Sequence, residues 1–382
     1  MVTITRGFKV KIYPNRSQEQ VLLRHMGAGR FVYNYFLDLK KKTYLETGKN
    51  VPYGQTSKML TKLRKETEWL QEVQFQPLQQ SLRSLDVAYN RFFRKQAMFP
   101  KFHKKSGRQS MRKVTGWSVV GNRISIMEGV SVSFRGAFPA KRSATLAISR
   151  DAVGDWYAST IAEEKRKPPK LKGAIGIDLG LNHLAVTSDG EKYKNPRVLG
   201  GLLERVQLAS KALSRTKKGG MKRAKKQLAL ARTHRKVERV RKNGTHHVSR
   251  AIVSKNHAMI AVEDLNVKGM MRNRRLSRSI SDASWSELLR QLAYKQKWNG
   301  GSVVKIGRFF PSSKTCHVCN HVVEALMLSE RQWVCPKCET THDRDVNAAK
   351  TILKQAGERL GVETKALALA QAGTKPLSVK HG

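Results

Sequence analysis

The sequence is poor in acidic residues. Its 382 residues include 28 Asp and Glu against 74 Lys and Arg, which gives a formal net charge of +46 at pH 7. A chain with so few acids repels itself unless a polyanion neutralises it. We therefore expect nucleic acid, bound over a large surface, as the partner; an anionic membrane is the weaker alternative. The basic residues are spread along the whole chain, which excludes an ordinary enzyme with a basic tail.

Long apolar runs are also lacking. No stretch approaches the roughly 18 apolar residues of a membrane span, and the N-terminal segment 1–6 lacks the apolar core of a signal peptide. We therefore expect no membrane span and a location in the cytoplasm, where reduced thiols suit metal binding. The chain is long enough for two or three domains with cores of their own, and it shows no internal repeat.

Cysteine is scarce as well, and all four cysteines lie in two Cys-x-x-Cys pairs near the C-terminus. Two such pairs at this spacing are typical of one closed structural zinc site, in which four thiolates surround the ion. A redox pair or chance clustering is the alternative interpretation. No cysteine remains for catalysis or for a disulfide elsewhere. The predicted zinc ligands are Cys316, Cys319, Cys335 and Cys338.

Three acids stand at notable positions. Asp178 ends the apolar run that begins at Ala174, Glu263 ends the run that begins at Ala258, and Asp345 follows the cysteine pairs. Burying an unpaired carboxylate is costly, so an acid at the end of a buried strand needs a reason. Three carboxylates at one sheet edge can hold two divalent ions about 4 Å apart, the arrangement used for in-line phosphodiester cleavage. For each acid alone, a solvated strand end is the alternative.

The pattern of apolar residues changes along the chain. The first part predicts a strand followed by helices and a β-rich block, and strand and block together would close a small barrel. The second part predicts an α/β arrangement. The expected elements are a strand over 6–13, a helix capped near Ser17 and ending before Gly48, helices from about Ser57 and from Pro77, a basic and aromatic connection over 94–112, β-structure over 114–163, a linker at 166–170, strands near 173–178, 183–188 and 191–194, a helical hairpin over 199–250 broken near Gly219, a strand ending at Glu263, a helix capped by Ser284 and Glu287, a strand from Ser302 to Gly307, and a helix from Asp345 to about Gly357.

The predicted hairpin over 199–250 carries basic residues almost without acids. A charge run is usually a solvated face, but here one sign dominates so strongly that a surface tracking phosphates is favoured. The residues we single out are Lys217, Lys218, Lys222 and Arg223.

Four motifs follow one another in a specific order. They are Gly-Ile-Asp-Leu-Gly at 176–180, Val-Glu-Asp-Leu at 262–265, the paired Cys-x-x-Cys, and Asp-Arg-Asp-Val-Asn-Ala-Ala at 343–349. Each motif alone is weak, but the ordered set resembles the TnpB proteins, insertion-sequence-encoded relatives of type V CRISPR effectors. The resemblance extends over nearly the whole chain.

The resemblance implies a wedge-type β-barrel with an inserted helical recognition lobe, followed by an RNase H-like (RuvC) nuclease domain that a zinc ribbon interrupts. The implied boundaries are 1–17 for the first part of the barrel, 18–100 for the recognition lobe, 101–170 for the second part of the barrel and a linker, 171–313 for the first part of the nuclease, 314–341 for the zinc-binding, target nucleic-acid-binding insertion, 342–358 for the second part of the nuclease, and 359–382 for a flexible tail.

The resemblance also implies a function. A guide RNA encoded at the end of the element would direct cleavage of complementary double-stranded DNA beside a short adjacent motif, with one protein copy per RNA. The implied cofactors are one structural Zn²⁺ and two Mg²⁺ held by Asp178, Glu263 and Asp345. One Mg²⁺ would activate water, and the other would stabilise the leaving 3′-oxygen. The setting would be the prokaryotic cytoplasm, at the nucleoid when DNA is bound.

Several alternatives stay open. Asp343 competes with Asp345 as third acid, although the family pattern Asp-x-Asn-Ala-Ala selects Asp345. Asp264 beside Glu263 is expected to be a turn or cap residue, because strand alternation turns it to the other face. Gln79 and Gln80 could read an adenine of the adjacent motif; otherwise they are surface glutamines. A guide-independent transposase and a non-catalytic zinc-ribbon regulator are the rival functions.

Overall fold

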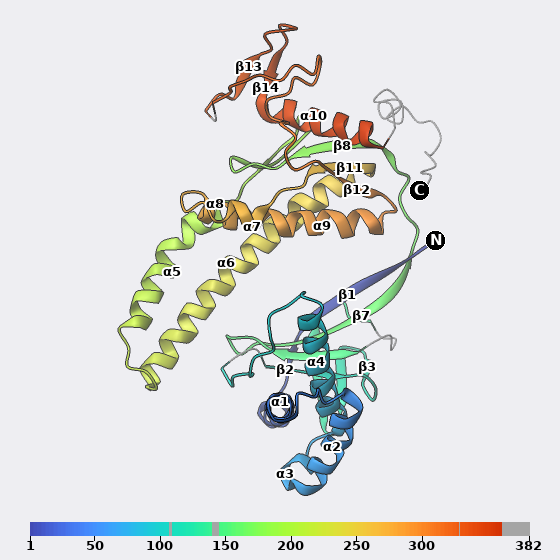
Figure 1. The fold of residues 1–382 in the computed structure, drawn as a ribbon, viewed down its shortest axis with the longest axis vertical. Helices are drawn as coiled ribbons and strands as arrows, with labels where there is room; N and C mark the ends of the chain where they lie inside the picture. The colour runs from blue at the N-terminus through green and yellow to red at the C-terminus, as the bar shows by residue number, and fades with distance from the viewer. Residues whose placement is uncertain (107–108, 140–144, 328, 361–382) are drawn as a thin grey trace. The chain divides into compact units, whose positions relative to one another are not determined.

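A computed structural model describes residues 1–106, 109–139, 145–327 and 329–360 (Figure 1). Contacts divide the chain into two units. The first is Thr3–Lys165, and the second comprises Met1–Val2 and the chain from Arg166 onward. The predicted flexible tail at 359–382 lies outside the described residues from residue 361 on.

The first unit combines a seven-stranded sheet with four helices. The order of the strands is β2-β6-β7-β1-β5-β4-β3, so β2 and β3 are the edges of the sheet among the described residues. The expected barrel is therefore an open, curved sheet. The elements are β1 (Val2–Tyr13), α1 (Arg16–Thr47), α2 (Tyr53–Glu66), α3 (Glu68–Gln71), α4 (Phe75–Phe93), β2 (Gln109–Lys113), β3 (Ser118–Val120), β4 (Arg123–Met127), β5 (Val130–Arg135), β6 (Leu146–Arg150) and β7 (Trp156–Arg166).

Two hydrophobic cores hold the first unit together. Alternating residues of the strands, including Ile12 and Ile124, pack with Leu22 of α1 in the first core. The second core lies among the helices, where Phe36 of α1 meets Leu82 of α4. Because α1 contributes to both cores, it joins the sheet to the helices.

The helix ends correct some of the sequence-based expectations. The N-cap of α1 is Asn15, not Ser17: the Asn15 side chain accepts a hydrogen bond from the Gln18 backbone N–H, and the Gln18 side chain accepts one from Asn15 N–H. Gly48 ends α1 in the left-handed conformation, as predicted. Ser284 precedes its helix without a capping hydrogen bond, so the expected cap there is wrong.

The second unit is built on a five-stranded sheet of order β10-β9-β8-β11-β12. Strands β8, β11 and β12 are parallel, and β9 and β10 continue the sheet as an antiparallel meander. The elements are β8 (Lys172–Asp178), β9 (His183–Thr187), β10 (Lys192–Lys194), α5 (Val198–Ser214), α6 (Met221–Ser254), β11 (His257–Glu263), α7 (Val267–Met270), α8 (Ser277–Ala283), α9 (Trp285–Trp298), β12 (Ser302–Ile306), β13 (Gln332–Val334), β14 (Thr341–Asp343) and α10 (Arg344–Arg359).

The two faces of this sheet carry different layers. Ile175 and Val262 pack against α6 and α9 on one face. Ala174 and Ala261 pack against Ile352 of α10 on the other (Figure 1). The sheet is thus covered on both faces, which explains why β8 and β11 read as continuous apolar runs.

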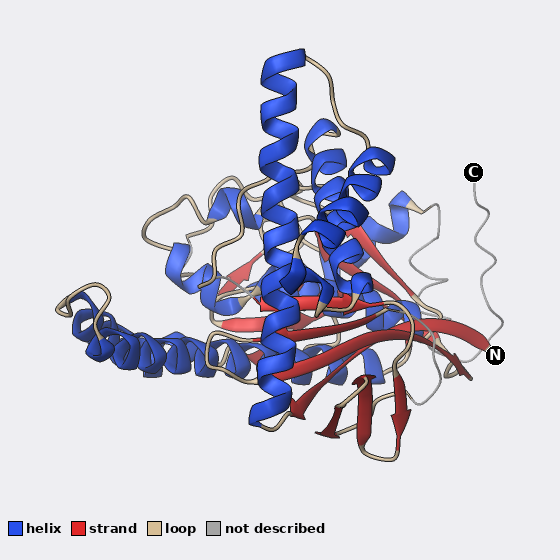
Figure 2. Cartoon of the chain, turned by 90° about the horizontal axis from the view of Figure 1, so that it is seen from below, coloured by secondary structure: helices blue, strands red, loops and turns tan. Residues whose placement is uncertain are grey.

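Helices α5 and α6 form the predicted hairpin, which extends away from the sheet of its own unit (Figure 2). The break lies at residues 215–220, around the predicted Gly219. Helix α6 is rich in Lys and Arg, whereas the basic residues of α5 are Arg205 and Lys211. Within the part of the chain that the structure describes, no helix combines the length and the apolar character needed to cross a membrane.

Candidate metal centres and nucleic-acid surfaces

Two predicted acids lie side by side at the carboxyl ends of β8 and β11. The parallel register pairs Ile177 with Val262, so Asp178 and Glu263 follow at the same level of neighbouring strands. Asp178 lies two residues after Gly176 of β8, and Glu263 lies two residues after Ala261 of β11. Both Gly176 and Ala261 face α10. Since side chains alternate along a strand, both carboxylates lie on the face that α10 covers.

The third acid, Asp345, reaches the same edge on α10. A Cβ added to Gly176 would overlap the carbonyl oxygen of Ala349 and lie 2.9 Å from Cβ of Leu353. The helix backbone therefore rests directly on β8, which only glycine permits at this position. Asp345 lies one helical turn, about 6 Å, before Ala349 along α10. Asp178 lies two residues, also about 6 Å, beyond Gly176 along β8.

The three carboxylates influence one another. Burial, together with the charges of Glu263 and Asp345, raises the pKa of Asp178 to about 7. A hydrogen bond from the backbone of Leu179 and the nearby charge of Arg344 act in the opposite direction. Burial also raises the pKa of Glu263. A site that disfavours its own negative charge in this way suits a cation.

Protein groups engage two of these carboxylates. Ser312 Oγ donates a hydrogen bond to Glu263. Arg331 donates one of 3.3 Å to Asp345 Oδ1, and His183 Nδ1 lies 3.8 Å from Asp345 Oδ2. Sequence reasoning missed all three partners, because Ser312 and Arg331 stand in segments without a recognisable pattern and His183 was noted only as the start of a strand.

The two competing acids have other partners. Asp343 is the N-cap of α10: its Oδ1 accepts hydrogen bonds from the backbone N–H groups of Asp345 and Val346, and its Oδ2 lies 2.6 Å from Lys192 Nζ. Asp264 lies just beyond β11 and pairs with Lys305 and Arg308 at 2.9 and 2.7 Å. Of the two acids, neither is among the groups that raise the pKa of Asp178.

The four cysteines form one cluster. Their Sγ atoms all lie within 4.8 Å of one another, and no disulfide joins them. The separations of 3.6 Å for Cys316–Cys338 and 3.5 Å for Cys319–Cys335 are close to the edge of a tetrahedron with Zn–S bonds of about 2.3 Å, which is about 3.8 Å. The residues therefore fit one zinc ion.

Asn347 connects the cysteine cluster to α10. Its Oδ1 accepts hydrogen bonds from the backbone N–H of His317 and from His317 Nδ1, at 3.0 and 2.9 Å, and its Nδ2 donates one of 2.7 Å to the carbonyl of Thr315. The side chain is 1% exposed. Asn347 thus binds the residues on both sides of Cys316. It stands on α10 two positions after Asp345. Sequence reasoning noted this asparagine only as part of a motif.

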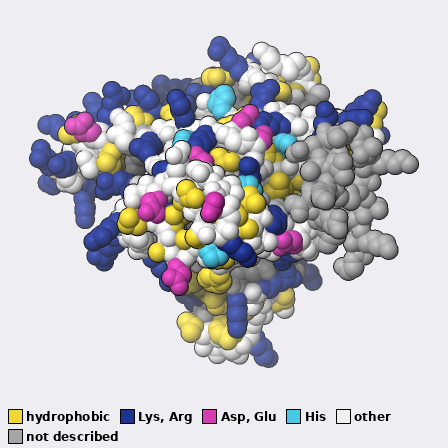
Figure 3. Space-filling model, turned by 90° about the horizontal axis from the view of Figure 1, so that it is seen from above, with side chains coloured by type: hydrophobic (Ala, Val, Ile, Leu, Met, Phe, Trp, Pro, Cys, Tyr) yellow, Lys and Arg dark blue, Asp and Glu magenta, His cyan; other side chains and the backbone are white. Residues whose placement is uncertain are grey.

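The basic residues predicted on the hairpin differ in their surroundings. Lys217 and Lys218 lie exposed in the turn between α5 and α6, and Lys222 lies exposed in the first turn of α6. Arg223 instead closes the turn, donating hydrogen bonds to the carbonyls of Leu213 and Thr216. Lys and Arg side chains gather over this hairpin at the left of Figure 3.

The two glutamines also differ. Both are half-buried on α4. Gln80 lines a pocket of about 230 Å³ together with Arg30, His103 and Arg112, whereas Gln79 is not among its lining residues. The pocket offers polar and cationic groups around Gln80, which suits the edge of a base better than a surface position would.

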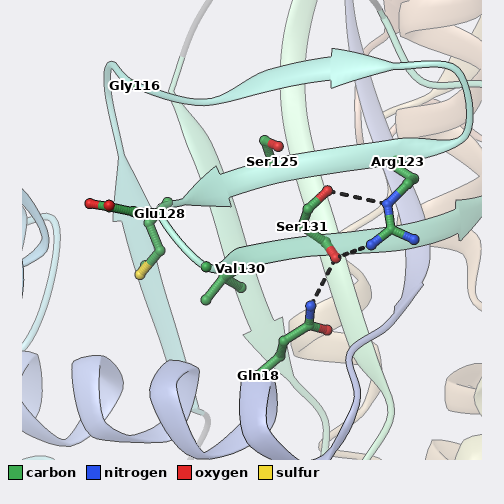
Figure 4. A pocket seen from close by; sticks show the side chains of 9 residues that line it. Gln18, Gly116, Arg123, Ser125, Glu128, Val130 and Ser131 are labelled. Carbon is green, nitrogen blue, oxygen red and sulfur yellow. Dashed lines mark hydrogen bonds between the residues drawn. The ribbon is translucent and has the colours of Figure 1, made fainter.

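A further pocket of about 540 Å³ lies beside the β4–β5 turn (Figure 4). Three of the polar residues drawn there are joined by hydrogen bonds: Arg123 donates to Oγ and O of Ser131, and Gln18 Nε2 donates to the same carbonyl. Their engagement within the wall fixes the turn, so we assign this pocket no ligand.

Comparisons with known proteins agree with this geometry. Family models match at 1–49 (helix-turn-helix domain), 158–274 ("Probable transposase") and 285–352 (Cas12f1-like, TNB domain). A Streptomyces pristinaespiralis protein named "Putative RNA-guided DNA endonuclease" is 35% identical over 92% of this chain and 90% of its own. Escherichia coli K12 InsQ, which carries the same description, is 33% identical over 91% of each chain. A solved Cas12f1–sgRNA–target DNA complex shares the fold, with a TM-score of 0.59 and 12% identity over 92% of this chain and 98% of that one.

These relatives, which align along most of the chain, define the class of the protein as a nuclease. More closely, the chain belongs to the TnpB family, as its motifs predicted. The matched "helix-turn-helix" region, in contrast, contains the strand β1 and the single long helix α1.

Proposed function

We propose that the protein is an RNA-guided DNA endonuclease, which binds a guide RNA encoded by its element and cleaves complementary double-stranded DNA beside a short adjacent motif. The proposal rests on the electrostatic contact of Asp178 with Glu263 and Asp345, in a chain that aligns along most of its length with relatives named for this activity. The formal charge of +46 supports it, since guide and target together are a large polyanion.

The domains follow from the same proposal. The open sheet of the first unit is the wedge, formed by 1–17 and 101–170, and the helices within 18–100 are the recognition lobe. The five-stranded sheet and α10 form a RuvC nuclease split into 171–313 and 342–358, with the zinc ribbon at 314–341 between its parts. The parallel arrangement of β8, β11 and β12 and the packing of α10 on β8 support this assignment.

Two Mg²⁺ are the proposed ions of the acidic centre, because their preferred ligands are carboxylate oxygens. Bound Mg²⁺ supplies an activated water and stabilises the leaving 3′-oxygen. Asp178, Glu263 and Asp345 are the residues that would hold the two ions. Asp345 is favoured over Asp343, whose carboxylate caps α10 and pairs with Lys192. Ser312 orients Glu263, and Arg331 neutralises part of the charge of Asp345.

The remaining parts have supporting roles. Zn²⁺ held by Cys316, Cys319, Cys335 and Cys338 fixes the ribbon. Lys217, Lys218 and Lys222 contact phosphates, and Gln80 reads the adjacent motif within its pocket, in preference to Gln79. We propose one protein copy per guide RNA.

A matched pair of variants tests the acidic centre. The protein is purified from cells carrying its own locus, with its bound RNA, and is given DNA that contains the guide-complementary target beside randomised sequence. Asp345→Asn is expected to lower the cleavage rate by roughly three orders of magnitude, because the negative charge of a proposed metal ligand is removed. Asp343→Asn should cut nearly as well as the natural protein, since asparagine caps a helix equally well.

Both variants should retain their RNA. Cleavage by Asp345→Asn at the natural rate would remove this residue from the mechanism. The "Probable transposase" match keeps one rival in view. Joining of DNA strands by protein freed of RNA would support a guide-independent transposase instead.

A further inference from the structure

A group of aromatic rings in the first unit is left open to solvent. Phe93 of α4 packs against Tyr89 and Phe92 of the same helix. In the following connection, Phe99 packs on this group, and Lys41 Nζ lies over the rings of both Phe99 and Phe102. We call these five rings the aromatic platform. Phe99 packs edge-on against Tyr89 and Phe92, with ring centroids 5.6 and 5.2 Å apart. Phe93, Phe99 and Phe102 are nevertheless 63%, 38% and 47% exposed. Rings gathered at a surface in this way mark an interaction site more often than single exposed residues do.

The connection that carries Phe99 and Phe102 is anchored to α1. Asn34 and His103 exchange two hydrogen bonds: Asn34 Nδ2 donates to the carbonyl of His103, and the His103 backbone N–H donates to Asn34 Oδ1, at 3.0 and 2.8 Å. The His103 ring stacks on Tyr33 with centroids 3.8 Å apart. The platform is thus ordered before any partner arrives, which reduces the entropy lost on binding.

The charge around the platform has one sign. Between Asp86 and Glu128 the sequence contains no acidic residue, and residues 101–106, which include three lysines, are all exposed. Lys41 Nζ lies 5.3 and 5.0 Å from the ring centroids of Phe99 and Phe102. The nearest acids on the helices are engaged, Asp38 with Lys42 and Asp86 with Asn90.

We propose that the aromatic platform stacks unpaired nucleotides of the guide RNA, while the surrounding lysines contact its phosphates. Flat rings beside cations are the combination that binds single-stranded nucleic acid, because bases stack and the backbone is neutralised. Exposure of aromatic rings to water is unfavourable in free energy. Guide RNA, which stays bound to the protein, covers the rings better than target DNA, which is bound only transiently. The inference deepens the proposed function and rests on it.

The test measures binding of the co-purified RNA species, re-added to RNA-free protein. Phe93→Leu with Phe102→Leu keeps apolar side chains but removes two stacking faces. We expect RNA affinity to fall about tenfold per ring, since stacking contributes about 1–3 kcal/mol per base. The matched control is Met98→Ala, which removes an 85% exposed apolar side chain that has no ring, and should bind as the natural protein does. Phe102→Trp should retain affinity.

A second readout is ultraviolet crosslinking, in which a peptide containing Phe93 or Phe102 should join to an unpaired nucleotide. If the natural protein binds no RNA, the proposed function itself fails. If it binds RNA and the double variant binds equally well, the platform inference alone is overturned. Unchanged RNA affinity with weakened target-DNA binding would assign the platform to DNA and would likewise overturn it.

Discussion

The cysteine cluster and the acidic centre both attach to the first turn of α10, but their ligands are held differently. The four Sγ atoms face one another within 4.8 Å. Among the carboxylates, Glu263 accepts a hydrogen bond from Ser312, and Asp345 accepts one from Arg331. The four thiols therefore face one another as a nearly complete set for one ion, whereas two of the acids are engaged by donors from the protein.

The difference matches the roles that we propose for the two centres. A structural ion needs a closed shell, and its binding energy stabilises the fold. A catalytic ion needs open positions, and the uncompensated charge of its empty site reduces stability, as the raised pKa of Asp178 indicates. The link between the centres is Asn347, which joins the zinc ribbon to the helix that carries Asp345.

Among the changes that test the link between the two centres, breaking the cysteine cluster is expected to have the largest effect. Cys335→Ser should release the bound zinc and reduce target cleavage by about 100-fold or more, because the ribbon that grips α10 loses its fold. Zinc content by elemental analysis and cleavage rates measure this. The matched control is Val334→Ser, which changes an exposed neighbour and should keep both zinc and activity. Retention of zinc by Cys335→Ser would contradict the assignment.

A smaller effect is expected from Asn347→Ala. This change removes the hydrogen bonds between α10 and the residues beside Cys316, but it leaves the four cysteines and the three acids in place. Residues that orient metal ligands typically contribute 10–100-fold. We expect a loss of this order in cleavage rate, with guide RNA affinity unchanged, and faster transfer of zinc to a coloured chelator. Thr351→Val removes a hydroxyl that donates to the carbonyls of Thr315 and Asn347 but keeps the Asn347 side chain, and it should show a weaker form of both changes. Normal zinc release together with normal cleavage would show that the centres are independent.

The smallest effect concerns stability. The pKa of Asp178 is about 7 in the folded protein and about 4 when unfolded, so the folded state holds its proton more tightly. The free energy of unfolding therefore falls as pH rises from about 4 to 7, and the loss is complete above pH 7. Without added Mg²⁺, Asp178→Asn should be more stable than the natural protein at pH 8, by roughly 2–4 kcal/mol, and the gap should narrow toward pH 5.5.

Thermal unfolding at the two pH values measures this gap. Added Mg²⁺ should raise the melting temperature of the natural protein more than that of the variant. An Asp178→Asn protein that melts below the natural one at pH 8 would show that the acids do not destabilise one another.

Local signals made part of this centre predictable. Asp178 and Glu263 each end an apolar run, and the parallel pairing of β8 and β11 brings the two ends together, so strand periodicity was a sufficient guide. The helix of Asp345 could be predicted because an acidic cap precedes it. The cysteine spacing predicted the cluster that the structure shows.

The rest depends on contacts between distant segments. Ser312 and Arg331 reach the acids from loops, and Asn347 binds residues about thirty positions away, so no periodic pattern could reveal them. The open edges of the first sheet were missed because alternation identifies strands but not whether the first and last of them pair.

The contact at Gly176 has a consequence for how the enzyme responds to its surroundings. Where side chains separate two elements, they can change rotamers and absorb a small shift. At Gly176 the helix carbonyl rests on bare strand backbone, so this cushion is missing. If nucleic acid displaces the cysteine segment and α10, the displacement is therefore transmitted directly to the end of β8. A shift of a fraction of an ångström there is enough to change the distance between the carboxylates of Asp178 and Asp345.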